Sequence, residues 1–189
     1  YGMDDPLHPL INDAWDVAGG PRGGDTADMT GPSTVAIIFV ESNGTIDPDQ
    51  YTWTTAAEDN ILSQISSGLA WWAAQAVEHD CSASFPNIVA YRHTDPVVQQ
   101  GYEPILHPSG DASLWIKAIM SNLGYTSGST STRVSNFNTG LRTAYNTPRA
   151  YTAFIAYNPS PAPNAFTDGY AAWAYFGGPY TQLLYRSFG

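Results

Sequence analysis

Positive charge is scarce in this sequence. Lys117 is the only lysine, and six scattered arginines stand against 17 acidic residues, which gives a net charge of −10 over 189 residues. Proteins bind nucleic acids chiefly through Lys and Arg contacts to phosphate, and anionic membranes attract basic clusters. The lack of a basic patch argues against a nucleic-acid partner and against docking on an anionic membrane.

Cysteine and long apolar runs are also scarce. Cys81 is the only cysteine, which excludes an internal disulfide, and we expect it to be a half-buried small residue. The longest apolar run, Val35 to Val40, is far shorter than the roughly 20 residues that span a bilayer. Polarity comes instead from Ser, Thr, Asn, Gln, Gly and Tyr. We interpret this composition as that of a secreted, extracellular protein, and Tyr1 as the start of a mature or trimmed product.

Familiar catalytic motifs are missing as well. The four histidines, His8, His79, His93 and His107, form no His-Glu-x-x-His motif, which would place two imidazoles on one helical face to bind zinc. The sequence has no Gly-x-Ser-x-Gly elbow, no phosphate-binding loop and no dinucleotide-binding glycine pattern. We therefore predict no complete catalytic set in this chain. A zinc site built from distant His and Asp side chains remains an open alternative.

Hydrophobic patterning predicts an α/β (α+β) fold with a mixed twisted sheet and packed helices. The β-branched stretch Thr34–Val40 is typical of a strand buried on both faces. Pro86 lies near the start of the second strand. Because proline has no N–H to donate, it indicates either that this strand lies at a sheet edge or that Pro86 stands where the strand begins. Strands are expected at 34–40, 84–91, 151–157, 170–176 and 180–186.

Three helices are expected between these strands. Apolar residues recur at three- and four-residue steps over residues 55–78, and Thr55 and Glu58 fit a capping box. That stripe includes Trp72, which we expect to face the sheet. A second helix opens at 109–111 and stops at Gly124, and a third carries a stripe from Val134 to Tyr145.

The N-terminal residues differ in composition from the rest. Residues 1–32 are rich in Gly, Asp and Pro, and we expect an irregular arm with a short helix near Leu10 to Val17. Residues 33–189 are expected to form one domain.

Oxygen-bearing side chains are densest just after the first strand. Calcium prefers carboxylate and amide oxygens, and Glu41, Asn43, Asp47 and Asp49 could supply them. Turn chemistry at Asn43-Gly44 and Asp47-Pro48 is the alternative explanation. Asn43-Gly44-Thr45 also matches a glycosylation acceptor.

Several stretches together resemble the leading part of secreted bacterial zinc metallopeptidase-like proteins of the zincin type. The resemblance covers about residues 34 to 189. The stretches are Phe39–Pro48, Trp53–Thr54 leading into Ser67–Trp72, Gly101–Ile105, Leu114–Ile116 and Ala172–Tyr180.

This resemblance implies the upper part of a zincin sheet, with zinc bound by a His-Glu-x-x-His helix beyond the present sequence. It also implies an edge strand that borders the cleft and pairs with extended peptide substrates. The implied strand consists of Tyr170, Ala171, Ala172, Trp173, Ala174, Tyr175, Phe176 and Gly177. No zinc ligand or catalytic glutamate of the family has a matching position here, so this chain alone is expected to be inactive.

Three functional hypotheses follow. The first is the N-terminal half of a metallopeptidase-like domain, which forms the upper wall of a peptide cleft and whose partner is a C-terminal portion or a second chain. The second is a non-catalytic extracellular assembly subunit, a filament or surface protomer that docks on its own copies. The third is a module that binds sugar or peptide through the aromatic residues between Tyr170 and Tyr180, although packing is the commoner role of such residues.

Overall fold

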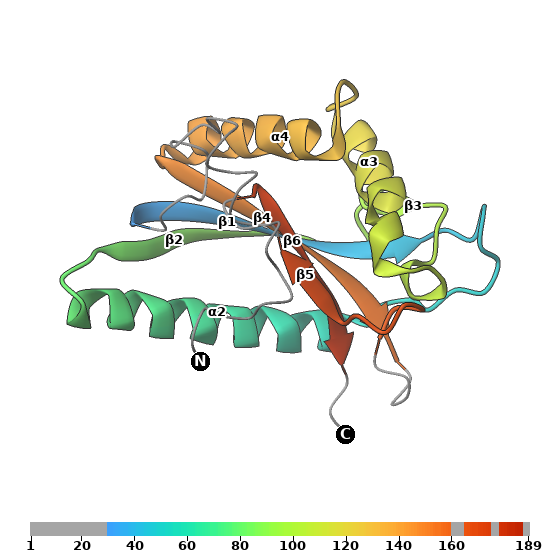
Figure 1. Cartoon of the computed structure of the whole chain (residues 1–189), viewed down its shortest axis with the longest axis horizontal. Helices are drawn as coiled ribbons and strands as arrows, with labels where there is room; N and C mark the ends of the chain where they lie inside the picture. The colour runs from blue at the N-terminus through green and yellow to red at the C-terminus, as the bar shows by residue number, and fades with distance from the viewer. Residues whose placement is uncertain (1–29, 160–164, 175–177, 187–189) are drawn as a thin grey trace, which may run out of the picture.

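The fold is built on one mixed sheet with helices on both faces. The computed structural model describes residues 30–159, 165–174 and 178–186. Within these residues the strand order is β2-β1-β4-β6-β5. The bounds are β1 Gly31–Ser42, β2 Ala83–Tyr91, β4 Arg149–Asn158, β5 Ala172–Ala174 and β6 Tyr180–Arg186. The predicted mixed α/β class is confirmed (Figure 1).

Strand direction changes only at one edge. β1 pairs in parallel with β2 and β4, and β4 pairs in parallel with β6, whereas β5 runs antiparallel to β6. A two-residue strand that the sequence did not reveal, β3 (Gln99–Gln100), extends the end of β1. The described part of the sheet therefore has β2 at one edge, as Pro86 predicts, and β5 at the other.

β1 is the centre of the core. Its residues from Ser33 to Ser42 are all buried, as expected for a parallel strand covered on both faces. The strand starts at Gly31, so Gly31 and Pro32, assigned to the arm in our prediction, belong to the sheet. The predicted helix near Leu10 to Val17 lies outside the described residues.

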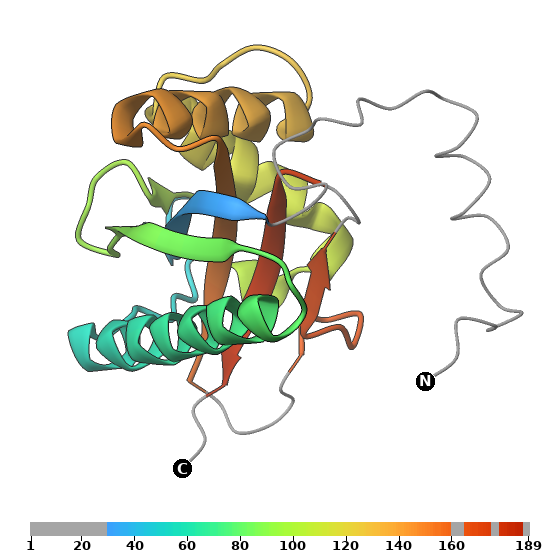
Figure 2. The same ribbon diagram turned by 90° about the vertical axis from the view of Figure 1, so that its left-hand side faces the viewer.

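The helices form two layers around the sheet (Figures 1 and 2). α2 (Thr55–Glu78) covers one face, while α3 (Ser113–Asn122) and α4 (Thr130–Tyr145) cover the other. Two short 3₁₀ helices, η1 (Pro104–Leu106) and η2 (Ser109–Ala112), lead into α3. None of the described helices is both long and apolar enough to cross a membrane.

The helix ends lie close to the predicted residues, but the N-cap of α2 differs from the prediction. α2 spans the predicted residues, but Thr54 is its N-cap and accepts a hydrogen bond from the Ala57 N–H. The predicted capping box is wrong, because the Glu58 carboxylate bonds to Arg92 and His93 instead. Gly124, with φ +91°, follows α3 in the left-handed conformation that glycine favours.

Two residues are more exposed than predicted. Trp72, expected on the buried stripe, is 50% exposed. Cys81, expected to be half-buried, is exposed in the turn between α2 and β2.

Candidate functional site

β5 lies within the residues that the sequence resemblance assigns to a substrate-binding edge strand. The predicted strand 170–176 is shorter in the structure, where β5 comprises Ala172–Ala174. Tyr170 and Ala171 precede it, and residues 175–177 lie outside the described part of the chain. β5 contacts β6 on one side, and no described strand pairs with its other side.

Along β5, the N–H and C=O groups of successive residues point alternately toward β6 and away from it. The Leu184 N–H donates to the Ala171 carbonyl at 2.8 Å, and Trp173 lies opposite Gln182. In antiparallel pairs only every second residue pair exchanges hydrogen bonds, so Trp173 bonds toward β6. The N–H and C=O groups of Ala172 and Ala174 therefore point away from the sheet, toward the open edge.

The segment before β5 is fixed to the helix layer. The Asp168 carboxylate accepts hydrogen bonds from the Ser109 N–H at 2.8 Å and the Ser109 hydroxyl at 2.7 Å. The ring of buried Phe166 stacks on Trp115, with centroids 6.4 Å apart. These contacts hold the start of β5 against η2 and α3. The position of this edge strand is therefore fixed by packing and hydrogen bonds.

The aromatic residues near β5 divide into two groups. Trp173 and Tyr180 pack edge to face with ring centroids 5.4 Å apart, and the Trp173 indole N–H donates to the Ser109 carbonyl. Tyr170 is 62% exposed. Tyr175 and Phe176 lie outside the described residues. Packing thus accounts for Trp173 and Tyr180, as expected for most aromatic stripes.

The four predicted calcium ligands mostly serve loop geometry. Glu41 accepts a hydrogen bond from the Trp53 N–H, and Asn43 accepts one from the Thr45 N–H in a local turn. The Asp47 carboxylate accepts from the Glu103 N–H and lies 2.7 Å from His107 Nε2. Asp49 is exposed. The calcium site therefore stays a prediction, and the turn chemistry explains the same residues without an ion.

Two buried carboxyl groups link the loops at the carboxyl end of β1. Glu41 at the end of β1 and Glu103 before η1 are 5% and 2% exposed. Glu103 accepts from the Tyr51 N–H at 2.9 Å, so the pair fixes residues 51 to 53 beside the sheet. Burial, which outweighs the Tyr51 hydrogen bond, and the nearby Glu41 charge raise the pKa of Glu103 to about 7. Burial also raises the pKa of Glu41.

Asp47 behaves in the opposite way. Burial acts to raise its pKa, but hydrogen bonds from His107 and the Glu103 N–H outweigh burial and lower it. Asp47 is thus a stable anion that holds two segments 56 residues apart in sequence.

Sequence reasoning also missed the burial of a third acidic side chain. Glu58, fully buried, accepts from the Arg92 guanidinium at 3.1 Å, and its other oxygen accepts from the His93 N–H at 2.7 Å. The contact joins the first turn of α2 to the end of β2. An acidic residue in a first helical turn suggests dipole pairing, so no local signal pointed to partners 34 residues away.

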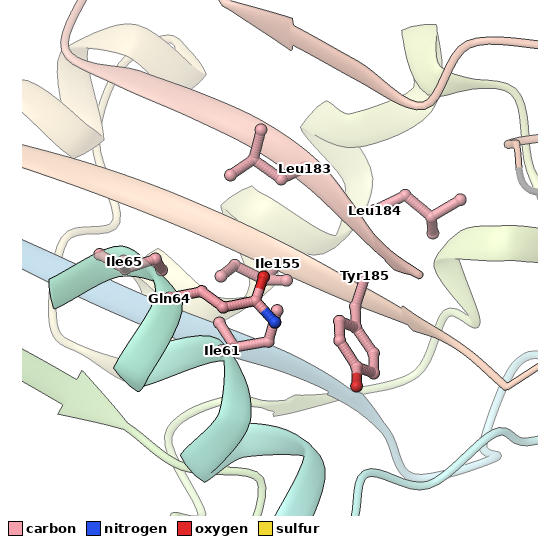
Figure 3. Close-up of a pocket in the computed structure, with 7 residues that line it drawn as sticks. All are labelled: Ile61, Gln64, Ile65, Ile155, Leu183, Leu184 and Tyr185. Atoms are coloured by element: carbon pink, nitrogen blue, oxygen red, sulfur yellow. The ribbon is translucent and has the colours of Figure 1, made fainter. Parts of the chain in front are cut away.

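A shallow apolar groove lies between α2 and β6 (Figure 3). Its volume is about 330 Å³. Ile61 and Ile65 of α2 form one wall, and Leu183 and Tyr185 of β6 form the other. Along α2, no residue from Asn60 to Val77 is charged, and Trp71 is 59% exposed. The side of a helix that faces water normally carries charged or polar residues, and in this stretch of α2 the polar residues are Asn, Ser and Gln.

Within the described residues, no group of three or more His, Cys, Asp or Glu side chains is arranged to hold a metal ion. The zinc implied by the resemblance therefore does not fit this part of the protein, and we derive no catalytic step through it. Comparisons with family models, curated proteins and solved structures found no match for the chain.

Proposed function

We propose that this chain forms the N-terminal half of a secreted metallopeptidase-like domain of the zincin type, with β5 as the edge strand of a peptide-substrate cleft. The observation that carries the proposal is the position of β5, an antiparallel strand at the edge of an otherwise parallel sheet. It lies within the residues that the sequence resemblance assigns to the substrate strand.

The open side of β5 suits an extended peptide. The backbone groups of Ala172 and Ala174 point outward, and a strand that adds to a sheet edge gains its affinity from such groups. Both alanines are exposed, and their methyl groups leave room for a neighbouring backbone. A peptide with one residue opposite Trp173 bonds to both alanines at once.

The groove between α2 and β6 supports the other part of the proposal, which is that this chain is only the N-terminal half of the domain. A parallel sheet is normally covered on both faces, and here the α2 side of β6 presents Leu183 and Tyr185 to the groove. We assign this face to the remaining part of the domain, which supplies zinc and the general base. This chain then positions the substrate.

Substitution at the outward N–H groups tests the edge-strand role. Proline at position 174 removes an outward N–H, which edge strands tolerate, whereas serine keeps it. We expect Ala174→Pro to weaken binding of a capped Thr/Ala heptapeptide by about tenfold, as for one lost hydrogen bond plus a steric clash. Ala174→Ser should bind like the unsubstituted chain. Equal binding by all three, measured by calorimetry, contradicts the proposal.

A non-catalytic assembly subunit is the second candidate, and one observation favours it. Trp71 and Trp72 on the second half of α2 are 59% and 50% exposed, and their ring centroids lie 6.0 Å apart. Apolar side chains gathered on one surface mark interaction sites. If copies of the chain associate through this surface, sedimentation will show oligomers that Trp71→Gln/Trp72→Gln abolishes. A monomer at all concentrations removes this candidate.

A further inference from the structure

A second hollow lies beside β5, on the face of the sheet that α3 and α4 cover. Its volume is about 250 Å³. The side chains that define its chemistry are Ser113 and Lys117 of α3, Ser131 of α4, Trp173 of β5 and Tyr180 of β6. It is separate from the apolar groove, which opens between α2 and β6.

The charge in the described lining of this hollow is positive. Lys117 is the only charged side chain among the described residues that line it, and no ion pair joins Lys117 to a described residue. The hydroxyl groups of Ser113 and Ser131 add donors, and none of the described residues in the lining has a carboxylate that would compete for them. In a chain with net charge −10, this is a site suited to an anionic group.

The register of β5 points a bound peptide into the hollow. Trp173 packs toward the α3 and α4 side, and successive side chains of a strand alternate between the two faces of a sheet. Residues directly opposite each other on neighbouring strands direct their side chains to the same face. The peptide residue opposite Trp173 therefore extends its side chain over Trp173 toward Lys117.

We propose that this hollow selects an acidic side chain, Asp or Glu, in an extended peptide that lies on β5. The proposal rests on the edge-strand function above and names the substrate class that it favours. Lys117 pairs with the carboxylate, while Ser113 and Ser131 donate hydrogen bonds to it. The aliphatic stem of Lys117 and the Trp173 ring contact the methylene groups of the peptide side chain.

Peptide binding to the charge variants tests the proposal. The probes are capped Thr/Ala heptapeptides with a central Glu, Gln or Lys. Because Lys117 is exposed, its ion pair contributes modestly, and we expect the Glu peptide to bind about twofold to fivefold more tightly than the Gln peptide. Lys117→Met should make the two equal, and Lys117→Glu should make the Lys peptide the tightest of the three. Arg142→Met, which removes a charge from the last turn of α4, should leave the preference unchanged.

The outcomes separate this inference from the function on which it rests. Equal binding of the three peptides to the unsubstituted chain, with binding still lost in Ala174→Pro, overturns the acidic preference and leaves the edge strand intact. A preference for the Glu peptide that persists in Lys117→Met also overturns it. If none of the peptides binds, both proposals fail.

Discussion

The two faces of the sheet are covered to different extents. On the α3 and α4 side, Trp115, Ile116, Ile119 and Phe154 are completely buried in one large cluster. On the α2 side, the helix that packs on the sheet has a single fully buried residue, the charged Glu58, and the groove beside β6 stays open. Within the described residues, the α3 and α4 side of the sheet is thus covered more completely than the α2 side, which is why our proposal places the further contact on the α2 side.

Truncation of one large side chain on each face gives the largest contrast. Trp115→Ala should lower the free energy of unfolding by about 3–5 kcal/mol, because it removes a fully buried ring. Leu183→Ala, in the wall of the open groove, should cost only about 1 kcal/mol. Urea unfolding measures both. Equal losses would show that the α2 side is as tightly packed as the other.

The buried carboxyl pair at the end of β1 predicts a pH effect of intermediate size. Folding raises the pKa of Glu103 from 4.5 to about 7, so the folded state binds this proton more tightly than the unfolded state does. Stability should therefore rise as the pH falls from 8 toward 4.5. Glu103→Gln, which mimics the protonated form, should stabilise the protein at pH 8 by at most about 3 kcal/mol.

The control for this variant is Glu78→Gln, which changes an exposed carboxyl group at the end of α2. It should leave the pH dependence as it was. The stabilisation by Glu103→Gln should fade as the pH approaches 4.5, where the folded and unfolded chains both bind the proton. A Glu103→Gln protein that is less stable at pH 8 contradicts the account of this pair.

The smallest expected change in stability is at the exposed tryptophans of α2. Trp71→Gln/Trp72→Gln should alter the free energy of unfolding by less than about 0.5 kcal/mol, because both rings are half exposed or more. Thermal unfolding at low protein concentration measures the effect. A loss above 2 kcal/mol would mean that these rings belong to the core of the isolated chain.

Local patterns in the sequence predicted much of the fold. The uninterrupted apolar run from Val35 to Val40 predicts β1 because a strand covered on both faces has no polar alternation. The three- and four-residue periodicity predicts α2 at its observed bounds. Strand order is a long-range property, and no local signal in Gln99–Gln100 predicts a two-residue strand beside β1.

The candidate site was predicted less completely. The sequence pointed to the right region for β5, but its length depends on pairing with β6, which periodicity does not report. The Glu41 and Glu103 contacts join segments 12 and 52 residues apart, and an acidic residue in a loop normally indicates solvent exposure. Trp72 falls on the apolar stripe of α2 but is 50% exposed, because periodicity shows which residues share a helix face and not what packs against each of them.

Amide exchange at β5 tests the central claim most directly. The account predicts that a saturating capped Thr/Ala heptapeptide slows hydrogen exchange at the Ala172 and Ala174 amides, which point outward, and changes Trp173 little, since its amide already bonds to β6. NMR of the labelled chain with and without peptide resolves these amides. Unchanged exchange at Ala172 and Ala174, with the peptide bound elsewhere, would contradict the assignment of β5 as the substrate strand.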